Sequence, residues 1–275
     1  MEVVDEVDRM WAAEVLVVAG ARAVVETDRG LKTHFAEPAA GPEGFLGSLE
    51  SSLVESGLAA SIVSWRWQRH EDWATLWRQG LGPRRVGHRI VVHPSWTESP
   101  SGRDDIDLTI DPGIAFGTAE HATTRLALTL LEPRVEPGQW VADVGTGTGI
   151  LAIAAAHLGA GRVLAYDTDP YAWSVTRENA LRNGVPTVVQ VVEGPMEEGA
   201  PEVEGLVVNI EWVRLAPLIP SLSTRVRSTG WMVLSGVLNE QRETALVLVR
   251  DLGWVVVDEA VEEEWWAVAL SRAAA

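Results

Sequence analysis

From Gln139 to the C-terminus, segments with strand character alternate with segments of helical period, and this alternation limits the possible folds more than any other feature of the chain. One connection departs from it, because a short acidic stretch of little helical character joins the third strand-like segment to the fourth. Such alternation predicts an α/β fold, with a mostly parallel sheet and helices on both faces. The expected strands are residues 139–145, 162–169, 188–194, 205–210, 230–237, 254–260 and 264–271.

The last two of these strands are joined by a very short link. Little more than VEEE, residues 261–264, lies between them, which is too short for a crossover. We therefore expect this last pair to be antiparallel in an otherwise parallel sheet. Two further strand-like segments, 88–96 and 105–111, precede the alternating region.

The N-terminal part of the chain has a different pattern. Helical spacing at 8–20 and 44–57, combined with three short strand-like segments, predicts a small α+β domain of the ferredoxin-like (split βαβ) type over residues 1–66. Residues 67–84 carry tryptophans one helical turn apart and then Gly and Pro, which predicts a linker helix. Residues 85–275 are then the larger domain.

Composition bounds the partners and the compartment. Acidic residues outnumber basic ones by 39 to 22, and the net charge of −17 argues against direct nucleic-acid binding. Two explanations of this negative charge remain: it keeps the protein soluble, or it attracts a basic partner. The chain has no Cys, no apolar run near the roughly 18 residues of a membrane span, and acids where a signal peptide carries bases. We expect a cytoplasmic monomer without disulfides, thiolate metal sites or membrane segments.

A glycine-rich motif follows the first strand of the alternating region. We call the sequence DVGTGTG, residues 143–149, the glycine turn. Gly145, Gly147 and Gly149 permit positive φ angles and let the backbone come close to a ligand. The helix that begins near Gly149 presents unpaired N–H groups to an anion. The motif favours a nucleotide-like ligand.

An acidic residue ends the next strand. Asp167 lies about twenty residues after the turn, where a carboxylate hydrogen-bonds ribose hydroxyls. It could instead cap the following helix, but Asp169, directly before Pro170, suits that role better. An acid at this position would repel a 2′-phosphate, which disfavours NADP, and the turn lacks the G-x-x-x-x-G-K-[ST] pattern of P-loop ATPases.

Asp143 separates the readings that remain. The sequence DVGTGTG resembles the first motif of class I S-adenosylmethionine (AdoMet) methyltransferases more than the G-x-G-x-x-G of dehydrogenases. In that resemblance, Asp143 orients the turn and the amino end of the cofactor's methionine. The resemblance implies a seven-stranded Rossmann-like sheet whose last pair is antiparallel.

A second motif narrows the resemblance to one family. The sequence DPGIAFGTAEHATT, residues 111–124, is similar to the F-G-T-G-x-H-x-T-T of the PrmA family; we call it the signature loop. Further matches are DWATLWRQGL at 72–81, VVNI at 207–210, LSGVLNEQ at 234–241 and EEEWWAVAL at 262–270. PrmA enzymes methylate the stalk-base protein of the large ribosomal subunit.

The family resemblance implies AdoMet as the cofactor, no metal, and a basic ribosomal protein as the substrate, methylated on lysine ε-amines or the α-amine. The N-terminal domain is then the substrate-recognition module. Asn209 and His121 are the candidate catalytic residues. The implied cofactor-binding residues are Phe116, Gly117, Thr118, Thr124, Asp143, Gly145, Thr146, Gly147, Asp167, Thr168, Pro195, Met196 and Asn209.

Other readings of these residues stay open. Thr123 or Thr124 could simply cap the following helix, His121 could hydrogen-bond within the loop, and Asn209 could be a strand-end residue in a turn. The whole chain could also be a paralogue that methylates another protein or a small amine, or an AdoMet-binding protein without catalysis.

Two positions depart from the family pattern. Ala119 stands where the family has Gly, and it stores strain if the loop requires a positive φ there. Pro195 follows Gly194 where a Ser-like contact to adenine is common, so that side-chain hydrogen bond is missing. Both departures bear on affinity rather than on the identity of the cofactor.

Overall fold

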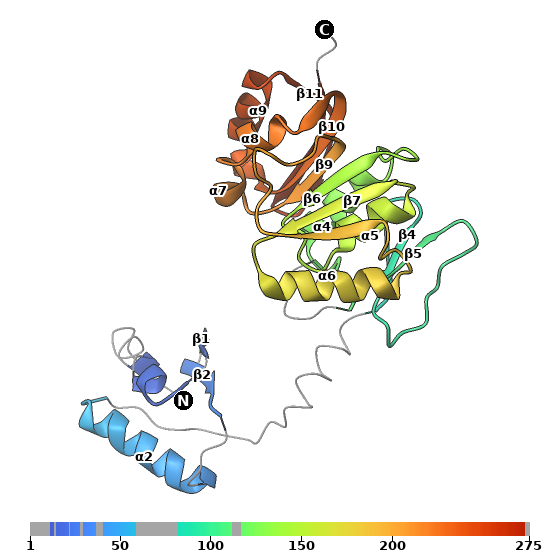
Figure 1. Ribbon diagram of the computed structural model, residues 1–275. Coiled ribbons are helices and arrows are strands. Elements are labelled where there is room, and N and C mark those ends of the chain that lie inside the picture. Colours follow the sequence, from blue (N-terminus) through green and yellow to red (C-terminus); the bar gives the residue numbers. More distant parts are fainter. Residues whose placement is uncertain are drawn as a thin grey trace. The chain divides into compact units, whose positions relative to one another are not determined.

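The computed structural model describes residues 12–13, 15–21, 23–27, 30–36, 41–58, 82–111 and 117–272. The chain divides into two compact units, Met1–Thr75 and Leu76–Ala275 (Figure 1). The third of the expected N-terminal strand-like segments, residues 60–68, lies outside the described residues. So do all but the last three residues of the linker helix expected at 67–84.

The first unit is a small α+β structure. Strands β1 (Ala23–Thr27) and β2 (Gly30–His34) pair antiparallel, and helix α2 (Gly41–Glu55) follows them. Residues 15–18 are also helical, as expected from their spacing. The apolar side chains of both helices and of β2 close a core of their own. Its buried members are Ala12, Leu16, Leu31, Leu49, Leu53 and Leu58.

The second unit is built on a seven-stranded sheet with the order β11-β12-β10-β9-β6-β7-β8. The strands from β10 to β8 are parallel, whereas β12 lies between β10 and β11 and runs antiparallel to both. This confirms the mostly parallel sheet and the antiparallel last pair. The bounds are β6 Trp140–Val144, β7 Arg162–Asp167, β8 Val189–Glu193, β9 Val203–Asn209, β10 Val226–Leu238, β11 Trp254–Glu262 and β12 Trp265–Arg272.

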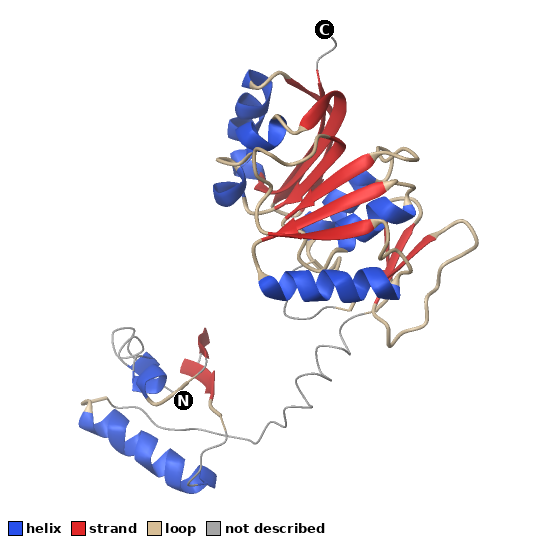
Figure 2. Cartoon of the chain, viewed as in Figure 1, coloured by secondary structure: helices blue, strands red, loops and turns tan. Residues whose placement is uncertain are grey.

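Helices cover both faces of this sheet (Figure 2). Successive strand residues point to opposite faces, so Val207 joins one apolar cluster while Leu206 and Val208 join the other. Three helices lie on the side of the first cluster: α4 (Ala122–Leu131), α5 (Ile150–His157) and α6 (Pro170–Arg182). Three lie on the side of the second: α7 (Trp212–Leu215), α8 (Ile219–Ser223) and α9 (Arg242–Asp251). The 3₁₀ turn η1 (Asn239–Gln241) directly precedes α9. The acidic link between β8 and β9 contains no helix, as expected.

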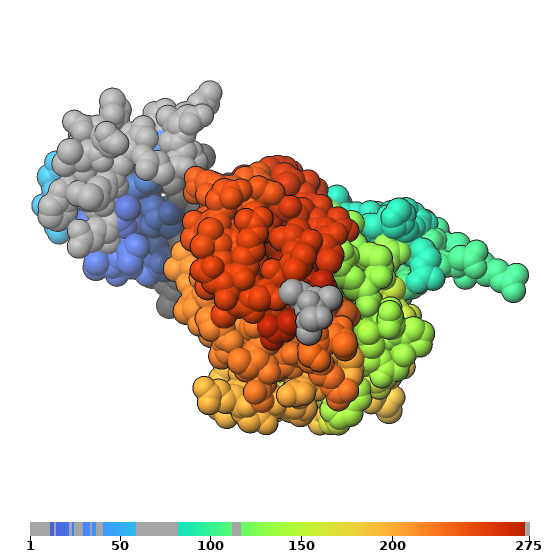
Figure 3. Space-filling model, turned by 90° about the horizontal axis from the view of Figure 1, so that it is seen from above, coloured from blue at the N-terminus to red at the C-terminus, as the bar shows by residue number. Residues whose placement is uncertain are grey.

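A three-stranded sheet precedes the signature loop. Strand β3 (Arg84–Val86) pairs antiparallel with β4 (Ile90–His93), and β4 pairs parallel with β5 (Ile106–Thr109). β4 and β5 match expected strands, but β3 was not expected, and its first residue falls where the linker helix was predicted to end. The β4–β5 connection, residues 94–105, projects from the unit (Figures 1 and 3).

Glu132 anchors this small sheet to α4. Its buried carboxylate accepts hydrogen bonds from the N–H groups of His88 (2.7 Å) and Arg89 (2.8 Å) in the β3–β4 turn. Gly87 in the same turn has φ +62°, and a Cβ there would lie 2.3 Å from a Glu132 carboxylate oxygen. The contact ties the β3–β4 turn to the C-terminal end of α4. None of the described helices is long and apolar enough to span a membrane.

Candidate active site

Polar residues gather where the central parallel strands end. Asp143 precedes the last residue of β6, Asp167 ends β7, and Asn209 ends β9. β6 lies between β7 and β9, so the order of the strands reverses at β6. In open α/β sheets, the carboxyl edge beside such a switch is where ligands bind.

The glycine turn has the backbone that its glycines predicted. Gly145, Gly147 and Gly149 have φ of +77°, +55° and +84°, in the left-handed region that residues with a Cβ avoid. A Cβ on Gly145 would lie 2.8 Å from the side chain of Ile210, and one on Gly149 would lie 2.9 Å from Thr176. Glycine is therefore required at these two positions by conformation and by space.

Asp143 is fully buried beneath this turn. One of its carboxylate oxygens, Oδ2, accepts hydrogen bonds from Thr146 Oγ1 (2.7 Å) and Ala152 N (3.1 Å), whereas Oδ1 has no hydrogen-bond partner. Burial raises the pKa of Asp143 to about 7, and the nearby Asp167 carboxylate adds to the shift. A buried carboxylate with an unused acceptor is suited to a cationic amino group, which fits the methionine end of AdoMet.

Asp167, the last residue of β7, binds the backbone of the glycine turn. Its Oδ2 accepts from Gly147 N at 2.9 Å and its Oδ1 from Asp169 N at 3.0 Å, and each oxygen keeps acceptor capacity for a ribose hydroxyl. Asp169 is the N-cap of α6, where it accepts from Tyr171 N at 2.9 Å. The prediction that Asp169, rather than Asp167, caps this helix is confirmed.

The end of β8 lies beside Asp167. Gly194 N donates to the Asp167 carbonyl oxygen at 2.8 Å, and this bond brings Pro195 and Met196 to the same edge of the sheet. Met196 is buried, whereas Thr168 is exposed. The cofactor contacts expected of these last three residues stay predictions.

The described part of the signature loop is tied to the glycine turn. Phe116 lies outside the described residues. Gly117 has φ +106°, and its carbonyl oxygen accepts a hydrogen bond from the buried hydroxyl of Thr148. A Cβ on Gly117 would lie 3.0 Å from that hydroxyl. Gly117 therefore allows the loop to approach the turn closely.

His121 is the N-cap of α4. Its Nδ1 accepts from Thr123 N at 3.3 Å and lies 2.8 Å from Thr123 Oγ1. The ring also packs edge-on against Trp265, with centroids 5.1 Å apart. This geometry matches the reading in which His121 bonds within its own loop, and the capping role considered for Thr123 or Thr124 is filled by His121. A catalytic role for His121 stays a prediction.

Two candidate site residues that are far apart in the sequence meet here. Asn209 Nδ2 donates to Thr124 Oγ1 at 3.3 Å, which joins the end of β9 to the first turn of α4. The buried hydroxyl of Ser235 in β10 donates to the Thr123 carbonyl oxygen at 2.8 Å. The carboxyl edge of the sheet thus holds the end of the signature loop at two points.

Ala119 has a left-handed backbone conformation, which glycine adopts without cost. Its φ is +62°, and its side chain is fully buried. Arg125 holds this conformation, because Nη1 donates to the carbonyl oxygens of Ala119 (3.0 Å) and Glu120 while Nε donates to Glu262 at 2.9 Å. The left-handed conformation costs an L-residue about 1–2 kcal/mol.

We expect Ala119→Gly to change the free energy of unfolding by less than about 1 kcal/mol. Relief of strain offsets the loss of one buried methyl, about 0.8 kcal/mol, and the backbone entropy of Gly, about 0.5–1 kcal/mol. Ala127→Gly is the matched control, since Ala127 is equally buried but helical, and should cost about 2 kcal/mol. Urea unfolding measures both values, and equal costs would mean that Ala119 is not strained.

Two residues at this edge were not assigned from the sequence. Thr148 belongs to the glycine turn, but nothing in its pattern showed that its hydroxyl bonds the signature loop. Asn179 is buried on α6 and donates to the Thr148 carbonyl oxygen at 2.9 Å. A polar residue on the apolar side of the helical segment that follows the expected strand 162–169 was the available signal for Asn179.

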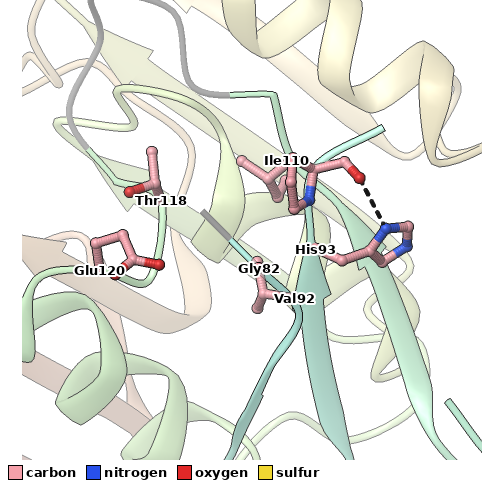
Figure 4. A pocket seen from close by; sticks show the side chains of 7 residues that line it. Gly82, Val92, His93, Ile110, Thr118 and Glu120 are labelled. Atoms are coloured by element: carbon pink, nitrogen blue, oxygen red, sulfur yellow. Dashed lines mark hydrogen bonds between the residues drawn. The ribbon is translucent and has the colours of Figure 1, made fainter. Parts of the chain in front are cut away.

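A shallow hollow lies beside the loop, with space for about one water molecule (Figure 4). Thr118 and Glu120 of the signature loop line one side, and His93 and Ile110 of the small sheet line the other. His93 Nδ1 lies 3.0 Å from the Pro94 carbonyl oxygen. A cofactor contact by Thr118 stays a prediction. No group of three or more metal-type side chains gathers among the residues that the structure describes.

The strand order, the glycine turn and the acid after β7 define a class I AdoMet-dependent methyltransferase. Residues 44–273 match the sequence model of the family described as ribosomal protein L11 methyltransferase (PrmA), and the chain belongs to that family. Methyltransferases of this family use AdoMet, and the donors and acceptors around Asp143 and Asp167 suit it.

Named relatives agree with this assignment. The chain is 43% identical over 214 residues to the ribosomal protein L11 methyltransferase of Pelotomaculum thermopropionicum, covering 76% of this chain and 68% of the relative. It is 40% identical over 233 residues to that of Symbiobacterium thermophilum, covering 81% and 74%. The crystal structure of ribosomal protein L11 methylase from Lactobacillus delbrueckii subsp. bulgaricus is similar with a TM-score of 0.65 and 31% identity, covering 70% of this chain and 98% of that one.

Proposed function

We propose that this chain transfers methyl groups from AdoMet to amines of ribosomal protein L11, on lysine ε-amines or the α-amine. The observation that carries the proposal is the bond between Thr124 and Asn209, because it brings the motif typical of the family to the carboxyl edge of the sheet. The relatives' names supply the substrate. The net charge of −17 favours the approach of a basic protein.

The described residues divide the binding of the cofactor among them. Asp143 would hold the amino group, the glycine turn would lie against the methionine end, and Asp167 would bond the ribose. AdoMet supplies a methyl group on a sulfonium, which an amine displaces in line. The task left to the chain is to position the two reactants, and alignment supplies roughly 7–11 kcal/mol of such a barrier.

The amine must be neutral to react. For a lysine with a pKa near 10.4, deprotonation at pH 7 costs about 4–5 kcal/mol. Good positioning exceeds this cost, so the reaction does not require a strong general base. Asn209 commits its Nδ2 to Thr124, and its amide oxygen is the atom that can accept a hydrogen bond from the incoming amine.

The direct test is incubation of the enzyme with labelled AdoMet and unmethylated L11. We expect label on L11, mapped by mass spectrometry to amines. Label on a different protein or on a small amine in a cell extract, with none on L11, would replace this proposal with the paralogue. AdoMet binding without any label would indicate a protein that binds the cofactor but does not catalyse transfer.

The N-terminal unit is proposed to recognise the substrate. Deleting residues 1–66 should leave AdoMet affinity within about twofold and reduce methylation of L11 at least about a hundredfold, because the cofactor motifs all follow Asp111. Calorimetry measures the first quantity and a methylation assay the second. A truncated enzyme that methylates L11 at the full rate would contradict the recognition role.

A further inference from the structure

Four polar side chains form a stripe along α6 and its C-cap. They are three to four residues apart, so they project from one side of the helix. Figure 1 shows the helix itself, α6, beneath the strands. Each of them bonds backbone groups outside α6. We call Trp173, Thr176, Asn179 and Asn183 the α6 stripe.

The ends of the stripe hold two strands. Trp173 Nε1 donates to the Asp167 carbonyl oxygen at the end of β7, at 2.7 Å. Asn183 bonds both backbone groups of Thr109 at the end of β5, accepting from its N–H at 2.9 Å and donating to its C=O at 2.7 Å. One helix therefore sets the distance between the cofactor-binding acid and the strand that leads into the signature loop.

The middle of the stripe holds the glycine turn. Thr176 Oγ1 donates to the Gly147 carbonyl oxygen at 3.0 Å, and Asn179 Nδ2 donates to the Thr148 carbonyl oxygen at 2.9 Å. Both side chains are buried, so solvent cannot replace these bonds. Two successive carbonyls of the turn thus depend on α6 for their hydrogen bonds.

Asn179 also holds the start of the signature loop. Its Oδ1 accepts from Asp111 N at 3.4 Å, and its Nδ2 lies 3.5 Å from the Asp111 carbonyl oxygen. Arg182 Nη1 donates to the same Oδ1 at 2.7 Å, and its Nη2 pairs with the Asp111 carboxylate at 3.1 Å. The arginine fixes which way the amide faces, because Oδ1 must point to the donors and Nδ2 to the carbonyls.

Thr148 connects the other described flank of the loop. Its carbonyl oxygen accepts from Asn179, and its hydroxyl donates to the Gly117 carbonyl oxygen. Asp111 and Gly117 are therefore both held against the glycine turn through this one pair of buried side chains. Asn183, one turn further along the stripe, bonds the backbone of Thr109 and the Asn179 carbonyl oxygen instead.

We propose that Asn179 is a positioning residue for AdoMet binding, because it holds Thr148 and Asp111 together and so sets the signature loop against the glycine turn. The inference rests on AdoMet being the cofactor, as in the proposed function. It does not depend on which amine accepts the methyl group.

The first test compares Asn179→Ala with Asn183→Ala in the full chain. Both remove an amide that bonds backbone groups, and both should lower the urea midpoint of unfolding. Asn179→Ala should also weaken binding of AdoMet and of S-adenosylhomocysteine by about ten- to thirtyfold in calorimetry, whereas Asn183→Ala should change it by less than about threefold. Equal effects of the two variants on affinity, or wild-type affinity in Asn179→Ala, would overturn the inference.

A second pair of variants, at Thr148, tests the same link independently if Asn179→Ala does not fold. Thr148→Val keeps the shape but removes the hydroxyl, and should weaken AdoMet binding by about three- to tenfold, while Thr148→Ser should restore it. Amide hydrogen exchange should quicken at Gly117 and its neighbours in Thr148→Val only. Wild-type affinity in Thr148→Val would contradict the link. If the wild-type protein binds AdoMet but leaves L11 unmethylated, the proposed function fails while these affinities still decide the inference.

Discussion

Replacing Asp143 with Asn is expected to stabilise the cofactor-free protein above pH 7 relative to the wild type. The native pKa of Asp143 is about 7, against an ordinary value of 3.8. A group that binds its proton more tightly in the folded state stabilises that state at low pH and loses this contribution as the pH rises through the folded pKa. The loss runs from about pH 4 to pH 7 and amounts to about 4 kcal/mol.

Asparagine cannot lose a proton in this range, so the variant should not show this part of the pH dependence. Its amide oxygen can still accept from Thr146 and Ala152, which keeps the packing beneath the turn. Urea unfolding of both proteins at pH 5, 6, 7 and 8 gives the difference in unfolding free energy. That difference should grow in favour of Asp143→Asn as the pH rises, and a difference that is constant with pH would show that Asp143 is not titrating there.

The same substitution should act in the opposite direction on AdoMet. The ionised Asp143 carboxylate is proposed to bond the cofactor's amino group, so Asp143→Asn should weaken binding by about 1.5–3 kcal/mol. In the wild type, affinity should rise between pH 6 and pH 8, because binding releases the proton of Asp143. Calorimetry in two buffers of different ionisation enthalpy measures that release. Binding without proton release at pH 6 would separate Asp143 from the amino group.

Asp167→Ala should weaken AdoMet binding by about 1–3 kcal/mol, which is roughly five- to 150-fold. The variant loses the proposed ribose bonds. It also leaves without its partner the Gly147 N–H, which donates a hydrogen bond to Asp167 at 2.9 Å. Asp169→Ala is the matched control from the same segment, since it removes the α6 N-cap at a cost of about 1 kcal/mol of stability and no cofactor contact. Calorimetry on both variants gives the comparison, and unchanged affinity in Asp167→Ala would remove this residue from the site.

Local patterns in the sequence were sufficient for much of the fold. The alternation after Gln139 predicted the sheet because apolar period and glycine punctuation are properties of neighbouring residues. The short link after β11 determined the antiparallel last pair, and Asp169 before Pro170 determined the start of α6, for the same reason. The glycine turn was predictable because only Gly adopts positive φ without cost.

Tertiary structure decided what distant residues do to one another. The place of β12 between β10 and β11, the contact of Asn209 with Thr124, and the bonds of Asn179 to Thr148 and Asp111 all join segments whose spacing carries no period. The sequence by itself determined that Asp143 stands before a glycine turn. Only packing decided that it is fully buried with one oxygen unpaired, and this desolvation raises its pKa to about 7.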